Sequence, residues 1–524
     1  MLSDHPVVIV GAGPIGLVTA LGLAHHGIPA IVLEEDDALS LETKAGTVLT
    51  RTLEVLDRYG ALEPVLAQSL RIDEIGEIDR ATNAPKPSVK TDVLADDTRF
   101  PFVINIPQGT LENVLHEQVR SRSGVEVRLG SRVRGFSQHD DSVTVEIEGP
   151  DSHRYQVQAS YLLGCDGGRS DIRTGLGVAV QGTTLEQRYM LVDLRVDLDL
   201  SNPRDYPYLA YFADPEEWMI LVRQPHCWRF LFPLAPGQAE PGVAELRDKA
   251  LRFIGEVDEV EVLGTNIYSV HHRVADRWRD QRVFLMGDAA HLITPMWALG
   301  LNTGVLDASN LPWRLAWVLR GWADESLLAG YEAEQAAVAI KGSGQMAESA
   351  RVAMGSGGGQ AIATTGWAFA MTRSLLGVSL DVGGTGDWSI VTQGLPDQGV
   401  QAGDRVPDMM LFGPDGDTTS VHQLATDSFV ALYFTDARRR PVLPAEGTRG
   451  LRHILVSRWD APHDSGLRDR SYFDPGSRLQ RKLAVEEDTV VLVRPDSHIA
   501  ALLPWKAGDG HIADLYASIT GRNT

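Results

Sequence analysis

The stretch Val7-Val8-Ile9-Val10-Gly11-Ala12-Gly13-Pro14-Ile15-Gly16 decides the fold of this chain. Its first four residues form a β-branched run, which is typical of a buried strand. A helical pattern follows to about His26, and Ala30-Ile31-Val32-Leu33 predicts a second strand. This order of strand, tight turn, helix and strand predicts a βαβ unit that opens a parallel sheet.

The glycines of this stretch have the spacing of a dinucleotide-binding turn. Gly11 permits the tight turn, Gly13 lets the backbone approach a pyrophosphate, and Gly16 lets helix and strand pack closely. Glu34 follows 18 residues after Gly16, where a carboxylate can accept both hydroxyls of an adenosine ribose. Because an acid there opposes a 2′-phosphate, the nucleotide is FAD or NAD; a turn without a ligand is the alternative. The positions expected to hold the nucleotide are Gly11, Gly13, Pro14, Ile15, Gly16 and Glu34.

Length and composition indicate a cytoplasmic protein of two or three domains. A chain of 524 residues exceeds one ordinary core. Apolar runs too short for a membrane span and an N-terminus without a basic region predict neither a transmembrane helix nor a signal peptide. The net charge of −22 opposes a nucleic-acid partner. The two cysteines, Cys165 and Cys227, are far apart, which excludes a disulfide framework.

The rest of the chain predicts further strands and helices. Residues 125–163 alternate as strands do, and residues 185–275 contain short aromatic-rich strands of a mainly antiparallel sheet. The pattern over residues 300–350 is helical. Apolar runs return after residue 400 and predict a separate small α/β domain.

Two further motifs lie at a distance from the first. Gly164-Cys165-Asp166-Gly167-Gly168-Arg169-Ser170 follows a predicted strand and leads to Arg173. Gly287-Asp288-Ala289-Ala290-His291 is followed by Pro295 and by Gly300-Leu301-Asn302-Thr303-Gly304. With the glycine-rich turn, these motifs make the sequence resemble the flavoprotein aromatic hydroxylases, the family of p-hydroxybenzoate hydroxylase and phenol hydroxylase, over roughly its first 350 residues.

The resemblance implies that the nucleotide is FAD. Asp288 follows a strand tip, where its carboxylate can accept from the ribityl hydroxyls. Gly300, Leu301 and Asn302 open a helix whose first N–H groups can face the N1–C2=O edge of the isoalloxazine, which carries negative charge when reduced. In the family the position of His291 is structural. The other cofactor-binding positions implied are Lys44, Gln108, Asp166 and Pro295.

The resemblance also implies a reaction. NADPH or NADH binds transiently and reduces the FAD. The second motif, with Arg169 and Arg173, could contact this nicotinamide nucleotide. O₂ then adds to give a flavin C4a-hydroperoxide that attacks a phenolic ring; no metal is needed. A small phenolic substrate, O₂ and NAD(P)H are therefore the expected partners. Epoxidation or Baeyer–Villiger oxidation of a polycyclic substrate, or a flavin-binding protein without turnover, are the alternatives.

The aromatic-rich region supplies the candidates for contact with substrate. Tyr208, Tyr211 and His226 could hydrogen-bond the substrate oxygen, because a positioned group can favour the reactive phenolate. Pro295 is implied near the flavin face where oxygen reacts. The family usually has Gly-Gly shortly after this proline, and here the positions hold Trp297-Ala298. The indole either shapes the substrate pocket or packs nearby.

The predicted fold class is α/β and α+β. A discontinuous Rossmann-like FAD-binding domain comprises residues 1–180 and 265–350, and it is interleaved with an antiparallel substrate-binding sheet of residues 70–110 and 181–264.

Two further parts complete the predicted organisation. Residues 351–399 form a helical connector. Residues 400–524 are similar to the thioredoxin-like domain of phenol-hydroxylase-type members, through Gly403-Asp404-Arg405-Val406-Pro407-Asp408. This part contains no cysteine, so thiol chemistry is excluded there. The expected role of this part is structural or a contact between subunits, and the chain could form a homodimer.

Overall fold

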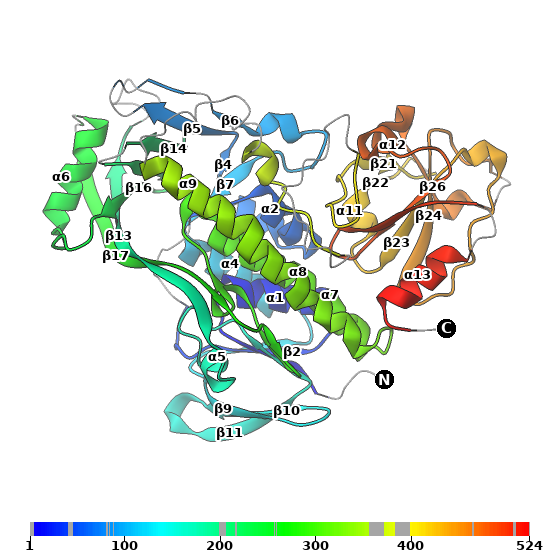
Figure 1. Ribbon diagram of the computed structural model, residues 1–524, viewed down its shortest axis with the longest axis horizontal. Helices are drawn as coiled ribbons and strands as arrows, with labels where there is room; N and C mark the ends of the chain where they lie inside the picture. Colours follow the sequence, from blue (N-terminus) through cyan, green and yellow to red (C-terminus); the bar gives the residue numbers. More distant parts are fainter. Residues whose placement is uncertain are drawn as a thin grey trace.

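The computed structural model shows two interleaved sheet-based parts and a C-terminal part packed beside them (Figure 1). The residues that it describes are 5–39, 46–79, 82, 84–86, 88–198, 206–214, 217–255, 257, 259–355, 371–382, 399–414, 416–463, 466–506 and 510–522.

A six-stranded, mainly parallel sheet forms the first part, in the order β18–β19–β12–β1–β2–β8. Its strands are β1 (Val7–Val10), β2 (Ala30–Leu33), β8 (Val125–Arg128), β12 (Tyr161–Gly164), β18 (Arg279–Asp280) and β19 (Val283–Leu285). In register, Val10 lies between Leu33 and Gly164, and Gly164 lies beside Leu285. The three sequence motifs follow β1, β12 and β19, so they emerge at one edge of this sheet, where parallel sheets bind ligands.

Helices and small sheets surround this sheet. Helix α1 (Pro14–His25) packs against α4 (Gln108–Arg120) and α7 (Leu299–Leu319). Short elements complete this part: β3 (Thr47–Val48), α2 (Thr50–Arg58), α3 (Leu62–Leu66), β4 (Leu70–Ile72), β7 (Val103–Asn105) and α5 (Asp171–Gly175). An antiparallel meander lies at the lower edge of Figure 1: β9 (Arg132–Gln138), β10 (Val143–Glu148) and β11 (Arg154–Ala159).

The second part is an eight-stranded sheet in the order β20–β17–β13–β16–β15–β14–β5–β6. Its strands are β5 (Glu74–Asp79), β6 (Val89–Lys90), β13 (Val180–Val196), β14 (Leu209–Ala213), β15 (Met219–Gln224), β16 (Cys227–Leu234), β17 (Val260–Ala275) and β20 (His291–Leu292). Helix α6 (Val243–Ile254) packs on one face, while the other face contacts the loop before α7. The predicted combination of a parallel and an antiparallel sheet is confirmed, although β17 crosses the boundary expected at 264/265.

A nearly continuous run of helix follows α7 and crosses the molecule diagonally in Figure 1. It consists of α8 (Ala329–Ala337), a π-helical segment (Val338–Gly344) and α9 (Gln345–Gly355). Helix α9 packs on β14 and on the loop before α7. Of the predicted connector, the structure describes residues 351–355, 371–382 and 399.

The C-terminal part has its own seven-stranded sheet, in the order β22–β21–β25–β24–β23–β26–β27. Strands β23 and β24 are parallel, and β26 and β27 continue antiparallel. Its elements are β21 (Met410–Phe412), β22 (Thr418–Ser420), α11 (Val421–Leu424), β23 (Phe429–Phe434), β24 (Leu451–Ser457), β25 (Ser471–Phe473), α12 (Arg478–Leu483), β26 (Thr489–Val493), β27 (Ile499–Pro504) and α13 (His511–Ile519). These elements form an α/β unit with its own sheet, and both its limits as a separate domain and its thioredoxin-like class stay predictions.

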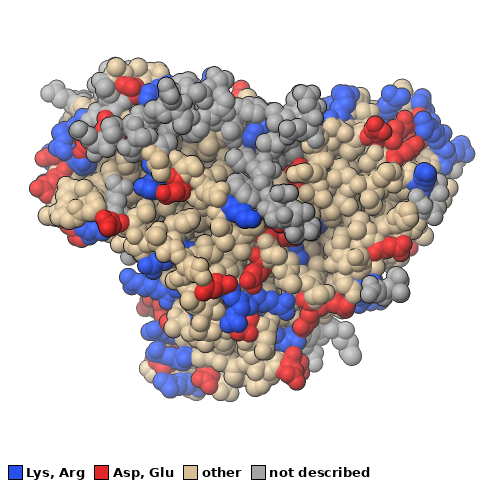
Figure 2. Space-filling view, viewed as in Figure 1, with Lys and Arg blue, Asp and Glu red and all other residues tan. Residues whose placement is uncertain are grey.

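The surface mixes charges of both signs. On the face seen in Figure 2, acidic and basic side chains are interspersed rather than gathered into one field. Within the described ranges, no helix has both the length and the apolar character needed to cross a bilayer.

Buried ion pairs join the C-terminal domain to α2. Glu54 of α2 pairs with Arg405, and both side chains are fully buried. Burial alone would raise the pKa of Glu54, but the charges of Arg405 and His422 hold it well below its ordinary value. One turn away, Arg58 donates to the Ser497 hydroxyl at 2.6 Å. Helix α2 is therefore shared between the two domains.

We expect Glu54→Gln to lower the free energy of unfolding by about 3–5 kcal/mol, because it removes the carboxylate that pairs directly with the buried Arg405 charge. The matched control is Glu261→Gln, which breaks a surface pair in which Glu261 is 59% and Arg195 62% exposed, and which should cost less than about 1 kcal/mol. Urea unfolding of both variants measures the difference. Equal losses would contradict the idea that this contact holds the domains together.

Candidate active site

The glycine-rich turn lies where β1 ends and α1 begins. Gly11 has a φ of +103°, and a Cβ there would lie 2.5 Å from the carbonyl oxygen of Cys165, so only glycine fits. A Cβ at Gly16 would lie 2.0 Å from the carbonyl oxygen of Gly11, so α1 packs directly on the turn. At Gly13, no atom of the described residues outside its immediate neighbours lies within 4 Å of the Cβ position. The turn thus leaves open space at the N-terminus of α1, which fits a pyrophosphate.

Two carboxylates border this turn. Glu34, half-buried at the end of β2, accepts hydrogen bonds from the N–H of Ala12 at 2.7 Å and of Asp36 at 3.2 Å. Asp166 follows β12, and its Oδ2 accepts from the N–H of Ile172 at 3.0 Å. Burial raises the pKa of Asp166, and its buried Oδ1 has no hydrogen-bond partner among the described residues. Both positions fit acceptors for the hydroxyls of a dinucleotide.

The third motif packs directly against the first. A Cβ at Gly304 of α7 would lie 2.6 Å from the Cδ1 of Ile15, so the absence of a side chain lets α7 approach the glycine-rich turn. Asp288 lies beside this contact, in the short 3₁₀ turn Gly287–Ala289 that follows β19, and it is exposed. An exposed carboxylate at this strand tip fits the predicted contact with ribityl hydroxyls.

His291 is buried in a structural pair. Its Nε2 lies 2.8 Å from Oδ2 of Asp307, and both side chains are fully buried. The same Oδ2 accepts the N–H of Gly287 at 2.8 Å. The indole of Trp278 stacks on the imidazole at 5.0 Å. His291 therefore connects the third motif to α7 and is not placed to meet a substrate.

The first turn of α7 contains Gly300, Leu301 and Asn302. The Asn302 side chain is fully used: Oδ1 accepts from the N–H of Leu49 and the hydroxyl of Thr52, at 2.8 and 2.7 Å, and Nδ2 donates to two carbonyl oxygens. Any contact of this turn with the isoalloxazine must therefore come from backbone N–H groups, as the sequence predicts.

The residues just before α7 have a strained backbone. Trp297 has φ 60° and ψ 18°, and Ala298 has φ 54° and ψ 28°, so two consecutive non-glycine residues are left-handed. This conformation costs about 1–2 kcal/mol per residue for residues with a Cβ. Such strain persists only where surrounding contacts determine the conformation, and it gathers at functional sites. Pro295 closes the turn by accepting the N–H of Ala298 at 3.1 Å.

Tyr211 of β14 packs on this strained turn. Its ring stacks on the Trp297 indole with centroids 5.1 Å apart and planes 23° apart. Burial raises the pKa of Tyr211 above its ordinary value, while a backbone hydrogen bond from Trp297 acts in the opposite sense. The phenol is therefore protonated at neutral pH, which suits a hydrogen-bond donor and not a base. The structure brings together Tyr211, Trp297 and Pro295 of the predicted catalytic set.

Tyr208 and His226 lie elsewhere. Strand pleating sends Tyr208 to the opposite face from Tyr211, where its ring meets Trp228 at 6.0 Å and is 37% exposed. His226 is exposed in the two-residue turn that joins β15 to β16. The three candidates therefore cannot act on one substrate oxygen together.

Sequence reasoning missed two aromatic residues on the Tyr211 face. Tyr189 of β13 meets Trp218 at 5.1 Å and Tyr268 of β17 at 6.1 Å, both nearly perpendicular. The buried Tyr189 hydroxyl has no hydrogen-bond partner in the part of the chain that the structure describes. The alternation of side chains along β13 and β17 could have indicated which residues share a face. Only the pairing of the strands, however, shows that both tyrosines lie on the same face as Tyr211.

The remaining predicted cofactor positions are less informative. Gln108 begins α4, and its Nε2 donates to Oε1 of Glu112 at 2.8 Å. Lys44 lies outside the described residues. The FAD roles of both residues stay predictions.

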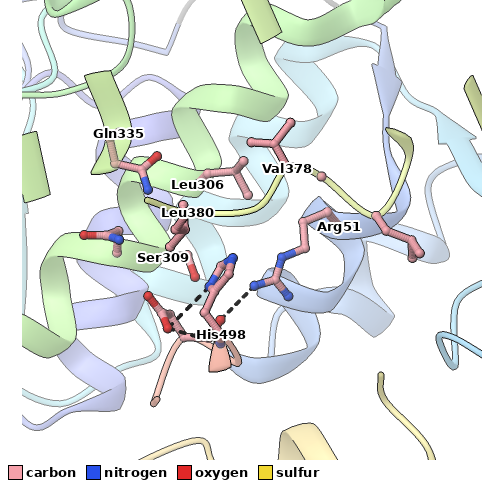
Figure 3. A pocket seen from close by; sticks show the side chains of 11 residues that line it. Arg51, Leu306, Ser309, Gln335, Val378, Leu380 and His498 are labelled. Carbon is pink, nitrogen blue, oxygen red and sulfur yellow. Dashed lines mark hydrogen bonds and ion pairs between the residues drawn. The ribbon is translucent and has the colours of Figure 1, made fainter. Parts of the chain in front are cut away.

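A small cavity lies away from this site, between α7 and the C-terminal domain (Figure 3). Its volume of about 10 Å³ has room for a single water molecule. Arg51 and His498 line it, and the buried Oε1 of Gln335 has no partner among the described residues. The cavity fits a structural water and is too small for a substrate.

Comparison with known proteins agrees with the geometry. The family model described as FAD binding domain matches residues 4–342. The chain belongs to the FAD-binding-domain family. The predicted flavoprotein enzyme with FAD as its cofactor is thereby confirmed, because the residues that border the glycine-rich turn fit that group.

Named relatives of this FAD-binding-domain protein are monooxygenases. It is 30% identical over 341 residues, or 64% of this chain and 83% of the relative, to para-nitrophenol 4-monooxygenase of Pseudomonas sp. (strain WBC-3). It is 31% identical over 63% of this chain to 3-(3-hydroxy-phenyl)propionate/3-hydroxycinnamic acid hydroxylase of Klebsiella pneumoniae (strain 342), and the match spans 59% of that relative. The crystal structure of aklavinone-11 hydroxylase with FAD and aklavinone matches with a TM-score of 0.80, 25% identity and 99% coverage of both chains.

We expect Glu34→Ala to weaken FAD retention by about ten- to hundredfold, because charge-assisted hydrogen bonds contribute about 1.5–3 kcal/mol each. Flavin absorbance per protein after gel filtration measures the loss. The control is Glu35→Ala, which removes an exposed carboxylate one residue away and should keep full flavin content. Equal flavin content in both variants would remove Glu34 from the site.

Proposed function

We propose that this flavoprotein hydroxylates a phenol-like aromatic compound with NAD(P)H and O₂. The observation that carries the proposal is the Tyr211–Trp297 stack, because it places a phenolic hydroxyl and an aromatic wall where the turn before α7 meets the second sheet. The relatives named as hydroxylases of phenolic compounds support this substrate class.

The chain's own residues would bind and orient the cofactor. The glycine-rich turn receives the pyrophosphate at the N-terminus of α1, and Glu34 accepts the ribose hydroxyls. The first backbone N–H groups of α7 orient the ring edge and stabilise negative charge there. The FAD, when bound, supplies the redox and oxygen chemistry.

The second sheet would bind the substrate. Tyr211 and Trp218 belong to one buried cluster that also contains Leu209, Val222 and Met296, and the partly buried Tyr268 packs against it. Such a surface would exclude water from the reacting atoms. The Tyr211 oxygen accepts the Trp297 N–H, so its own proton is available to a substrate oxygen. Tyr211 thus stabilises a bound phenolate by donating a hydrogen bond.

The direct test offers single phenols to the FAD-loaded protein and records NADH and NADPH consumption, H₂O₂ release and product mass. The expected result is consumption stimulated by substrate and matched by a product with one added oxygen atom. Consumption matched entirely by H₂O₂ for every phenol would contradict the proposal.

We expect Tyr211→Phe to lower hydroxylated product per NAD(P)H consumed by about tenfold or more, the usual scale for a lost catalytic hydrogen bond. Because the raised pKa keeps Tyr211 protonated across the working range, the shape of the pH–rate profile should stay unchanged. The control is Tyr208→Phe, which removes the same atom on the opposite face of the sheet. This variant should form as much product per NAD(P)H consumed as the wild type. A profile that loses an ionisation only in Tyr211→Phe would show that Tyr211 acts as a base.

A further inference from the structure

The side chain of Trp297 occupies a position where the backbone favours glycine. Its φ of 60° lies in the left-handed region, and the next residue, Ala298, shares that conformation. A glycine would adopt this backbone without strain. The indole is therefore held here by its contacts, despite the cost of the backbone.

Those contacts place the indole inside the proposed substrate region. Trp297 is 5% exposed and lies in the same buried cluster as Tyr211, Tyr189 and Trp218. The turn that carries it connects Pro295 to the first turn of α7, which is the turn that faces the isoalloxazine edge. Helix α9 packs against the same turn and closes its outer side. The indole thus lies between the FAD-binding edge and the aromatic face of the second sheet.

The volume of the Trp297 side chain is important at this position. Indole is itself a fused two-ring system, so a glycine at position 297 would leave a space of that size beside Tyr211. Protein interiors are close-packed, so this volume is available either to the side chain or to a ligand. A hydrophobic pocket discriminates its ligands largely by volume of this kind.

We propose that the Trp297 indole occupies the space beside Tyr211 that a fused ring system would need, and that it restricts this enzyme to single-ring phenols. The inference rests on the proposed function, because it assigns the substrate class of the same site. Trp297 then acts as a specificity-determining residue, and its stack on Tyr211 keeps it in place.

The experiment compares binding of phenol, naphthol and hydroxyanthraquinone to the FAD-loaded full chain, by calorimetric titration without NAD(P)H. We expect the wild-type protein to bind phenol more tightly than hydroxyanthraquinone by about tenfold or more. Trp297→Gly should reverse this preference by a similar factor. Trp297→Phe keeps an aromatic ring in the core and should bind naphthol, but not hydroxyanthraquinone, more tightly than the wild type does. This variant tests the inference if the glycine variant does not fold.

The control is Ala298→Gly, which relieves the same backbone strain one residue away without opening a ring-sized space. Its ring-size preference should equal that of the wild type. The inference is overturned if the wild type binds hydroxyanthraquinone as tightly as phenol, or if Ala298→Gly changes the preference as much as Trp297→Gly. NAD(P)H oxidation and product mass are recorded in parallel. A shift in binding preference without product in any variant would sink the proposed hydroxylation while leaving the size restriction intact.

Discussion

The contact between Gly16 and the carbonyl oxygen of Gly11 is the constraint on which the site depends. It sets α1 against the end of β1 with no side chain between them, so the helix N-terminus opens onto free space at Gly13. Because β1, β12 and β19 are parallel neighbours, the residues that follow them meet at this same edge. Ile15 packs against Gly304, which has no side chain, and α7 therefore lies close to the glycine-rich turn. One close backbone approach thus aligns three distant motifs.

A second set of contacts extends this alignment to the C-terminal domain. Asn302, in the first turn of α7, binds the backbone at the start of α2. Four residues after the start of α2, Glu54 pairs with Arg405 of the C-terminal domain, and Arg51 donates to the carbonyl oxygen of Asp496 at 2.7 Å. Removing the domain would take Arg405 away from Glu54 and the Ser497 hydroxyl away from Arg58. The contacts of the cysteine-free domain with α2 are consistent with the structural role that the sequence suggests, and that role stays a prediction.

The second sheet explains why aromatic residues close in sequence have different surroundings. Pleating places Tyr211 against the turn before α7, while Tyr208 points to the face that α6 covers. The strained Trp297 backbone is maintained by contacts from this face, since the Tyr211 ring stacks on the indole and its oxygen accepts the backbone N–H. Local backbone preference is thus violated where the second sheet meets the turn before α7, as expected of a functional site.

The sequence by itself determined the dinucleotide fold and the three motifs, because glycine spacing and acid placement act through local backbone geometry. These residues left FAD and NAD open, and the choice of FAD came from the resemblance to the flavoprotein aromatic hydroxylases. The sequence also predicted Tyr211 and Trp297 as candidates near the substrate, and it indicated the cysteine-free α/β domain. Only the tertiary structure decided that Tyr211 and Tyr208 lie on opposite faces, that Tyr189 and Tyr268 share the face of Tyr211, and that the Asn302 side chain bonds within the protein. These facts depend on strand register and on contacts between residues hundreds of positions apart, and no local pattern encodes such pairings.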